Sequence, residues 1–218
     1  MKVLVTSGAT REPIDSVRFI SNLSSGRTGA AICEALAVHG FGVTQLHGVD
    51  SAIAAGVFRR ESFTDHASLD AILRRLLKDS TFGAVIHTAA VGDFTVAEPA
   101  SRRKLDSGRE LVMRLRPNKK IIDGIRSYAA NLDLTLIGFK LTHDPDAGTR
   151  ARAVLELLRR SRADFVVHND VATIGSGAGH QFVIHARDGE DLSRCAGREA
   201  LATALVTLLE RQDSRSHA

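Results

Sequence analysis

The chain has few aromatic residues, few cysteines and no long apolar run. Its 218 residues include nine phenylalanines, one tyrosine and no tryptophan, so a platform on which nucleic-acid bases could stack is not expected. The two cysteines, Cys33 and Cys195, lack a metal-ligand spacing and any framework of further cysteines, which favours reduced core thiols in a cytoplasmic protein. No segment reaches the length of a transmembrane helix, and the first residues do not resemble a signal peptide. We therefore expect a cytoplasmic protein that does not enter a membrane.

A strong excess of charge of one sign is also lacking. Lysine and arginine total 29 and aspartate and glutamate total 25, a net charge of +4. This excess suits anionic ligands but is too small and dispersed to predict binding to nucleic acid. Hydrophobic residues make up 44% of the chain and charged residues 25%, which is ordinary globular composition. We predict one domain over residues 1–212 and a frayed polar tail over residues 213–218.

Short apolar runs alternate with segments of helical period, which is typical of an α/β fold with a largely parallel sheet. Strands are expected in "VLVT", "GVTQL", "GAVIHTAA", "LTLIGF" and "DFVVHN". Helices are expected after residue 27, near 69–77, near 121–128 with Asn118 as its cap, through 154–158 and near 201–209. Two further segments resemble hairpins, "RRKLDSGRELVMRLR" and "HQFVIHARDGEDLSRC", the second turning at Asp188-Gly189. We predict a Rossmann-like, doubly wound fold with a protruding hairpin arm at about residues 101–116.

The connection between the first strand and the first helix is unusually long, at about 20 residues where roughly two to six are usual. It has the spacing of neither a dinucleotide fingerprint nor a Walker loop. Ser24, Ser25 and Gly26 place hydroxyls and backbone N–H groups at a helix N-terminus, where a phosphate is stabilised by hydrogen bonds and by the helix dipole. Ordinary serine capping is the alternative, but it does not require the close backbone approach that Gly26 and Gly29 permit. We therefore predict an anion site.

Motifs follow the other strands at the same edge of the predicted sheet, where open parallel sheets bind their ligands. The stretch "VTSGATREPIDSVRFISNLSSGRTG" resembles the opening signature of phosphopantothenoylcysteine synthetase, the phosphopantothenate–cysteine ligase of coenzyme A biosynthesis. The segments "AAVGDF", "RKLDSG", "IGFKLTHD" and "HND" recur in that family's order, so the resemblance covers roughly residues 3–171. The "FKL" within "IGFKLTHD" resembles the stand-alone type, because fused bifunctional proteins commonly differ there, and we expect a ligase without the flavin-dependent decarboxylase domain.

This resemblance implies a ligase that joins 4'-phosphopantothenate to L-cysteine through an acyl-nucleotide intermediate, with release of pyrophosphate. It implies CTP or ATP as cosubstrate, CTP being the usual choice in bacteria. It also implies Mg²⁺ without a protein-only metal site, and a homodimer whose arms reach across to the partner. The attacking groups then belong to the substrates, in agreement with the lack of an evident Ser-His-Asp or Cys-His arrangement.

Three residues match catalytic positions of the family. Asn22 matches its catalytic asparagine, Arg18 the arginine four residues earlier, and Lys104 an essential lysine in a mobile arm. The resemblance implies that Asn22 and Arg18 contact the substrate. The alternatives are a turn residue at Asn22, a surface ion pair at Arg18 and a solvated charge run around Lys104.

The nucleotide-binding residues implied by the resemblance are Ser24, Ser25, Gly26, Ala89, Ala90, Asp93, Lys104, Phe139 and Arg160. Asp93 could instead cap a turn, and Phe139 could equally be plain core. Asn169 and Asp170, in "HND", are structural as readily as functional.

Departures from the family pattern leave the choice between CTP and ATP open. Arg27 stands where fused enzymes usually have lysine, and Lys119-Lys120 stand in a run that is usually "NPDI"-like. The helix around Arg160 has arginines where two lysines are usual, and arginine keeps the charge without lysine's compact geometry.

Two other functions fit the same fold. An NAD(P)-dependent reductase would suit the sheet, but the chain lacks G-x-G-x-x-G, and its only tyrosine, Tyr128, is not part of a Tyr-x-x-x-Lys pair. A catalytically inactive nucleotide-binding relative of the ligase is the other alternative.

Overall fold

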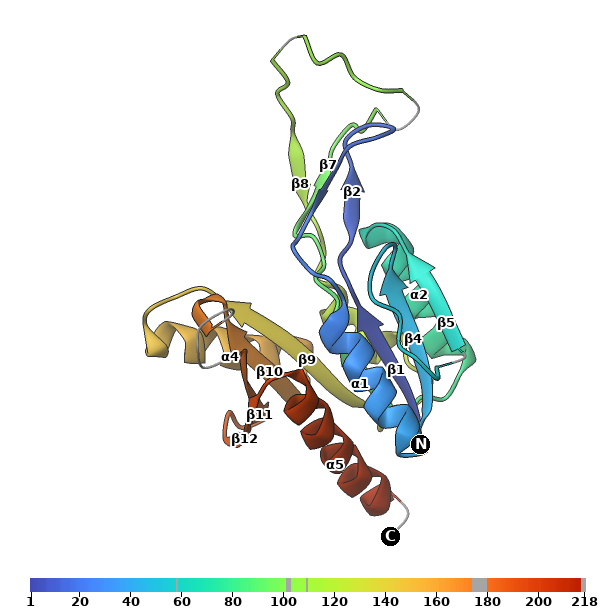
Figure 1. The fold of residues 1–218 in the computed structure, drawn as a ribbon, viewed down its shortest axis with the longest axis vertical. Helices are drawn as coiled ribbons and strands as arrows, with labels where there is room; N and C mark the ends of the chain where they lie inside the picture. The colour runs from blue at the N-terminus through green and yellow to red at the C-terminus, as the bar shows by residue number, and fades with distance from the viewer. Residues whose placement is uncertain (58, 101–102, 109, 174–179, 217–218) are drawn as a thin grey trace.

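An eight-stranded sheet forms the centre of the protein in our computed structural model, which describes residues 1–57, 59–100, 103–108, 110–173 and 180–216. The strand order is β12-β11-β10-β9-β6-β1-β4-β5 (Figure 1). The parallel strands are β1 (Lys2–Ser7), β4 (Gly42–Gly48), β5 (Arg59–Phe63), β6 (Ala84–His87), β9 (Thr135–Thr142) and β10 (Phe165–Asp170). The hairpin of β11 (Gln181–Ala186) and β12 (Asp191–Ala196) adds an antiparallel edge. The predicted Rossmann-like fold is confirmed.

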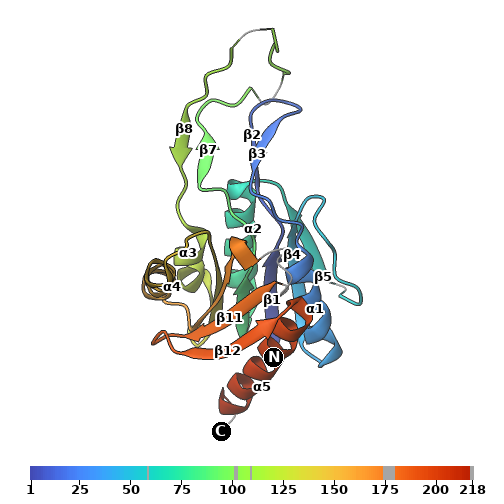
Figure 2. The same ribbon diagram turned by 60° about the vertical axis from the view of Figure 1, so that its left-hand side comes forward.

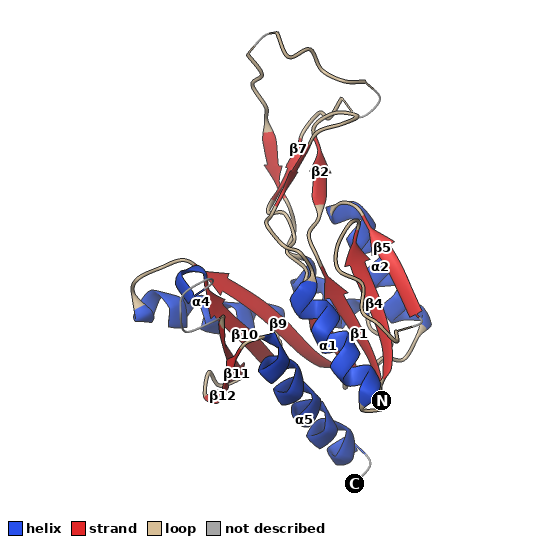
Figure 3. Ribbon diagram, in the orientation of Figure 1, coloured by secondary structure: helices blue, strands red, loops and turns tan. Residues whose placement is uncertain are grey.

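Helices cover both faces of the sheet (Figures 2 and 3). One face carries α1 (Arg27–Val38) and α5 (Arg198–Ser216), and the other carries α2 (His66–Asp79), α3 (Ile121–Tyr128) and α4 (Ala147–Ser161). A short 3₁₀ turn, η1 (Val171–Thr173), follows β10. Alternate residues of β1 supply the two cores: Val3 and Val5 pack with α1, whereas Leu4 packs with α2, as the two-residue period of a strand requires. Cys33 and Cys195 are both buried, as predicted.

Two short hairpins project together from the edge at which the parallel strands end (Figure 1). One pairs β2 (Arg11–Pro13) with β3 (Phe19–Ser21), and the other pairs β7 (Phe94–Val96) with β8 (Leu115–Pro117). Buried Glu12 joins them, because its carboxylate accepts hydrogen bonds from the backbone of His66 at 2.8 Å and from the hydroxyl of Thr95 at 3.0 Å. The protruding arm is confirmed, but its paired strands mostly flank the predicted segment. Residues 101, 102 and 109 of that segment lie outside the described residues.

Other expectations need correction. Asn118 does not cap α3, whose N-cap is Lys120. Instead its amide donates to the carbonyl of Gly92 at 3.0 Å, and its Oδ1 lies 2.7 Å from the Oγ1 of Thr95. Strands β2 and β5 were not expected, because their residues are mostly polar or charged. Strand β3 was not expected, because its three residues, Phe19–Ser21, are too few to give a pattern. Helix α5 continues past residue 212 to Ser216, and the N-terminal amino group of Met1 donates to Oδ2 of Asp213 at 3.3 Å.

None of the helices in the described part of the chain combines the length and the apolar character needed to cross a bilayer.

We predict that His87, at the end of β6, makes the fold sensitive to acid. Burial lowers its pKa to about 4, and its Nδ1 lies 2.9 Å from the hydroxyl of Thr6. Because the unfolded chain binds this proton more readily, stability falls as the pH drops below the unfolded pKa of about 6.5. Between about pH 7 and pH 4 the loss through His87 should be about 3 kcal/mol. Urea unfolding across this range should show a smaller pH dependence for His87→Asn, and an unchanged slope would contradict the assignment.

Candidate active site

The ends of β1 and β4 and the start of α1 meet where glycine is required. Gly8 has a left-handed φ of 83°, and a Cβ there would lie 1.9 Å from the Oγ of Ser51. Gly26, the N-cap of α1, has a φ of 73°, and a Cβ there would lie 2.9 Å from the Cβ of Ser51. A larger residue at either position would have a strained backbone and would clash with Ser51. The two glycines therefore allow the ends of β1 and β4 and the start of α1 to approach one another closely.

A pocket of about 670 Å³ opens beside this junction. The hydroxyl of Ser21 donates to the carbonyl of Thr10 at 2.8 Å, and Nδ2 of Asn22 donates to the carbonyl of Val91 at 3.1 Å. The N–H of Ala52 donates to the carbonyl of Ser25 at 2.9 Å. The lining residues are Ala9, Arg11, Phe19, Ser21, Asn22, Leu23, Ser24, Ser25, Val49, Asp50 and Ser51. The structure therefore brings together three of the predicted residues, Asn22, Ser24 and Ser25, next to Gly26.

The "AAVGDF" segment lies directly beside the first motif. The N–H of Ala90 donates to the carbonyl of Gly8 at 2.8 Å, and the carbonyl of Ala90 accepts from the N–H of Thr10 at 3.2 Å. The N–H of Ala89 donates to the hydroxyl of Thr6 at 3.2 Å. These bonds place the predicted backbone positions Ala89 and Ala90 between the strand ends and the Val91 carbonyl that holds Asn22.

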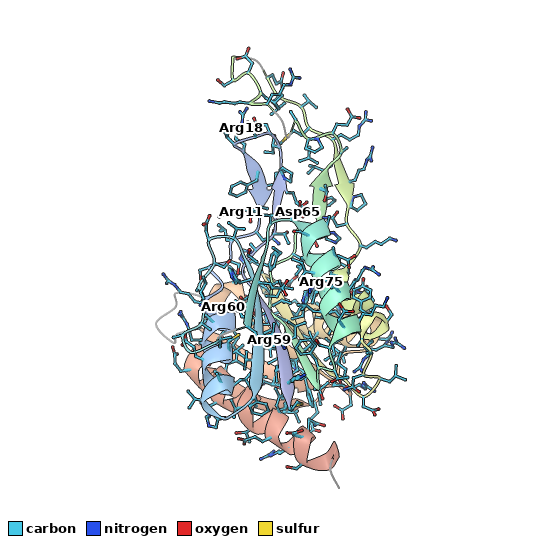
Figure 4. The ribbon with its side chains drawn as sticks, turned by 90° about the vertical axis from the view of Figure 1, so that its right-hand side faces the viewer. Arg11, Arg18, Arg59, Arg60, Asp65 and Arg75 are labelled. Carbon is cyan, nitrogen blue, oxygen red and sulfur yellow. The ribbon has the colours of Figure 1, made fainter. Side chains whose placement is uncertain are left out.

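Arg18 lies elsewhere, in the turn at the far end of the β2–β3 hairpin (Figure 4). Its Nε donates to Oδ2 of Asp15 at 2.8 Å, and its Nη2 donates to the carbonyl of Leu105 at 2.8 Å. The buried carboxylate of Asp15 also accepts from the N–H groups of Val17 at 2.9 Å, Arg18 at 2.8 Å and Leu105 at 3.1 Å. The Arg18 guanidinium thereby holds the pKa of Asp15 well below its usual range.

Lys104 is exposed on the arm, between two residues attached to this turn. Besides the bonds of Leu105, the carbonyl of Arg103 accepts from the N–H of Ser16 at 3.2 Å. Arg18 and Lys104 therefore belong to one unit formed by the two hairpins, whereas Asn22 belongs to the pocket at their base.

The other predicted nucleotide contacts lie in different surroundings. Asp93, within the "AAVGDF" segment, forms an ion pair with Lys120. Phe139 is half-buried and packs against the core beneath α1 and α5. Arg160 donates from α4 to Asp123 of α3 at 3.0 Å, and among the described residues it does not line the pocket.

Asp170 has a structural environment at the end of β10. Its Oδ2 accepts from the hydroxyl of Thr142 at 2.5 Å and its Oδ1 from the N–H of Ala172 at 2.9 Å. These bonds, the first above all, lower its pKa. Neighbouring Asn169 contacts Nε2 of His180 at 2.8 Å.

Arg11, Asp15 and Asp50 were missed as candidates. Arg11 and Asp15 lie in the same sequence motif as Arg18, and this was the signal that could have identified them. Hydrophobic periodicity does not show that Arg11 lines the pocket or that Asp15 anchors the arm. Asp50 follows β4 with no motif around it, so only the fold places it opposite Arg11.

Comparisons with known proteins identify relatives of the whole described domain. Residues 1–212 match the family described as the DNA/pantothenate metabolism flavoprotein C-terminal domain. The Coenzyme A biosynthesis bifunctional protein CoaBC of Thermococcus kodakarensis is 35% identical over 211 residues, which cover 96% of this chain and 51% of that protein. The chain thus spans about half the length of the curated relatives it matches.

Solved structures share the fold. The DNA/pantothenate metabolism flavoprotein from Streptococcus pneumoniae superposes with a TM-score of 0.85 at 26% identity, covering 97% of this chain and 99% of that one. A Cab2 mutant in complex with phosphopantothenate-cysteine superposes with a TM-score of 0.75 at 20% identity, covering 99% and 88%, a likeness of fold. The sequence motifs, the domain match and the fold agree, and this chain belongs to the family of the DNA/pantothenate metabolism flavoprotein C-terminal domain, the phosphopantothenoylcysteine synthetase family that its motifs indicated.

Proposed function

We propose that this chain is a phosphopantothenate–cysteine ligase of coenzyme A biosynthesis, working through an acyl-nucleotide intermediate with release of pyrophosphate. The observation that carries the proposal is the pocket beside the ends of β1 and β4, where Asn22 lies beside Ser24 and Ser25 and is hydrogen-bonded to the "AAVGDF" segment. The relative from Thermococcus kodakarensis, named for coenzyme A biosynthesis, supports it.

The first step requires donors rather than a protein nucleophile. A carboxylate oxygen of 4'-phosphopantothenate forms a bond to the α-phosphorus of the nucleotide, the bond to the β-phosphate oxygen breaks, and pyrophosphate leaves. Negative charge is crowded during this step, so hydroxyls, N–H groups and cations lower its barrier. Ser24, Ser25 and the start of α1 supply such donors in the proposed site, and Arg11 supplies a cation.

In the second step, the amine of L-cysteine forms a bond to the acyl carbon, the bond from that carbon to the phosphate oxygen breaks, the nucleoside monophosphate leaves, and the amine loses a proton to water. Asn22 uses one amide hydrogen to bond the Val91 carbonyl, which fixes the plane of its side chain. We propose that its remaining donor and acceptor orient the acyl group for this attack.

The nucleotide is proposed to be CTP rather than ATP, entering with Mg²⁺. Among the described residues, no group of three His, Cys, Asp or Glu side chains could hold a metal ion. Phosphate oxygens of the nucleotide would therefore supply most ligands of Mg²⁺, whose chemistry is to offset phosphate charge.

The decisive test is pyrophosphate release from CTP or ATP with 4'-phosphopantothenate, measured with and without L-cysteine. We expect more release with CTP than with ATP, and turnover to the amide only when cysteine is present. Asn22→Asp should impair conversion of the intermediate more than its formation, whereas Lys104→Gln should lower overall turnover by roughly tenfold or more because a phosphate-directed cation is lost.

Arg75→Gln is the matched control, since Arg75 forms an exposed ion pair with Glu61 away from the pocket. No release with either nucleotide would refute the ligase proposal, and wild-type turnover in both site variants would refute the residue roles.

Asp15 is expected to hold the arm in the position from which Lys104 acts. Asp15→Asn keeps the side chain's size but removes the charge that Arg18 and three backbone N–H groups stabilise. We predict faster trypsin cleavage after Lys104 and a lower kcat, with little change in the free energy of unfolding of the sheet domain. Asp106→Asn is the control, because Asp106 bonds only locally, to the N–H of Gly108, among the described residues. Equal cleavage rates in both variants would contradict this role.

We also propose a cytoplasmic homodimer in which a second copy covers the arm. The arm exposes Leu111, Val112, Met113 and Leu115, by 45%, 86%, 39% and 41% respectively, a clustered apolar surface that favours association. Light scattering at working concentration should give twice the mass of the chain, and Val112→Asp should shift this mass toward one chain. A monomeric mass for the unmodified protein would contradict the proposal.

A further inference from the structure

Arg11 enters the pocket as an oriented cation. Its backbone N–H donates to the carbonyl of Thr64 at 2.7 Å, which fixes the start of β2. Its guanidinium lies over the ring of Phe19, 4.5 Å from the ring centre, and Phe19 is the residue at the start of β3. The labelled side chains in Figure 4 show Arg11 nearer the sheet than Arg18. Stacking on an aromatic ring limits the positions that the guanidinium can take.

The partner of Arg11 is Asp50, on the opposite wall of the pocket. Nη1 of Arg11 donates to Oδ2 of Asp50 at 2.8 Å, and the Asp50 side chain is 72% exposed. Such an exposed ion pair is weak because water and salt compete with it. Asp50 also has a left-handed φ of 63°, a conformation that few residues other than glycine, asparagine and aspartate adopt readily.

We propose that Arg11 binds the phosphate group of a substrate in this pocket, and that Asp50 is an internal anion which occupies Arg11 until that phosphate displaces it. The inference rests on the proposed function, because it concerns the same pocket. A phosphate can accept two parallel hydrogen bonds from a guanidinium and carries more charge than a carboxylate. Ser24 and Ser25 line the same pocket and can donate to it as well.

The pairing would give the pocket selectivity. A ligand must offer Arg11 a stronger interaction than Asp50 does, so a singly charged carboxylate has little advantage and a phosphate has a clear one. Phe19 keeps the guanidinium in place while its partner is exchanged. Removing the charge of Arg11 should consequently weaken the affinity for a phosphate ligand, and removing the charge of Asp50 should strengthen it. An ion pair with only a structural role would not produce these opposite effects.

The test is equilibrium binding by calorimetry with the whole chain, using inorganic pyrophosphate as the first probe. We expect Arg11→Gln to weaken binding by about tenfold, the usual loss for a charged hydrogen bond. Asp50→Asn, which keeps the shape and tolerates the left-handed backbone, should tighten binding by about threefold. The affinity of Arg11→Lys for pyrophosphate should lie between those of the wild type and Arg11→Gln. The control Arg75→Gln should bind pyrophosphate as tightly as the wild type does. Circular dichroism melting of each variant is the control for folding.

Two further sets of probes identify the source of the phosphate. A loss on Arg11→Gln with 4'-phosphopantothenate, and none with pantothenate, CTP or ATP, assigns the group to the acyl substrate. The same loss with CTP or ATP, and none with 4'-phosphopantothenate, assigns it to the nucleotide.

Weaker binding in Asp50→Asn, or unchanged binding in Arg11→Gln, overturns the inference, and so does a wild-type chain that binds none of the probes. Intact phosphate binding without pyrophosphate release contradicts only the ligase proposal, so the two failures can be told apart.

Discussion

The site depends on one constraint: only glycine fits at positions 8 and 26. Both residues face Ser51, and a single added carbon at either would collide with it. Because close approach is allowed there, the connection after β1, the loop after β4 and the start of α1 share one point. The pocket, the contact between Asn22 and Val91 and the pairing of Arg11 with Asp50 all follow from that convergence.

Much of this fold could be predicted from the sequence, because buried strands and amphipathic helices leave periodic patterns. The alternation in β1 and the leucine spacing of α2 are examples. Strand β5 could not be found in this way: "RRESF" forms the exposed edge of the sheet, where charged residues discourage pairing with other chains. Asn118 was wrongly predicted as a helix cap, because its amide donates instead to the carbonyl of Gly92. This is a tertiary contact, and the local sequence pattern contains no sign of it.

The candidate site was predictable in part. Asn22, Ser24 and Ser25 are neighbours in sequence and remain neighbours in the pocket. Arg18 is only four residues from Asn22, but β3 intervenes, and an extended chain of this length carries the two residues more than 10 Å apart, at about 3.3 Å per residue. Spacing in sequence therefore could not show that Arg18 belongs with Asp15 and the arm. The opposite holds for Arg11 and Asp50, which are distant in sequence and bonded in space.

The burial of Cys33 and Cys195 has a chemical consequence for a protein proposed to handle free cysteine. Thiol–disulfide exchange needs an accessible thiolate. Cys33 is fully enclosed in the core, and burial raises the pKa of its thiol; Cys195 is 4% exposed. The two cysteine thiols are thus kept apart from a substrate, and from oxidised forms of that substrate, with which they could form mixed disulfides. The core isolates both cysteines from the redox chemistry of the molecule that the protein is proposed to use.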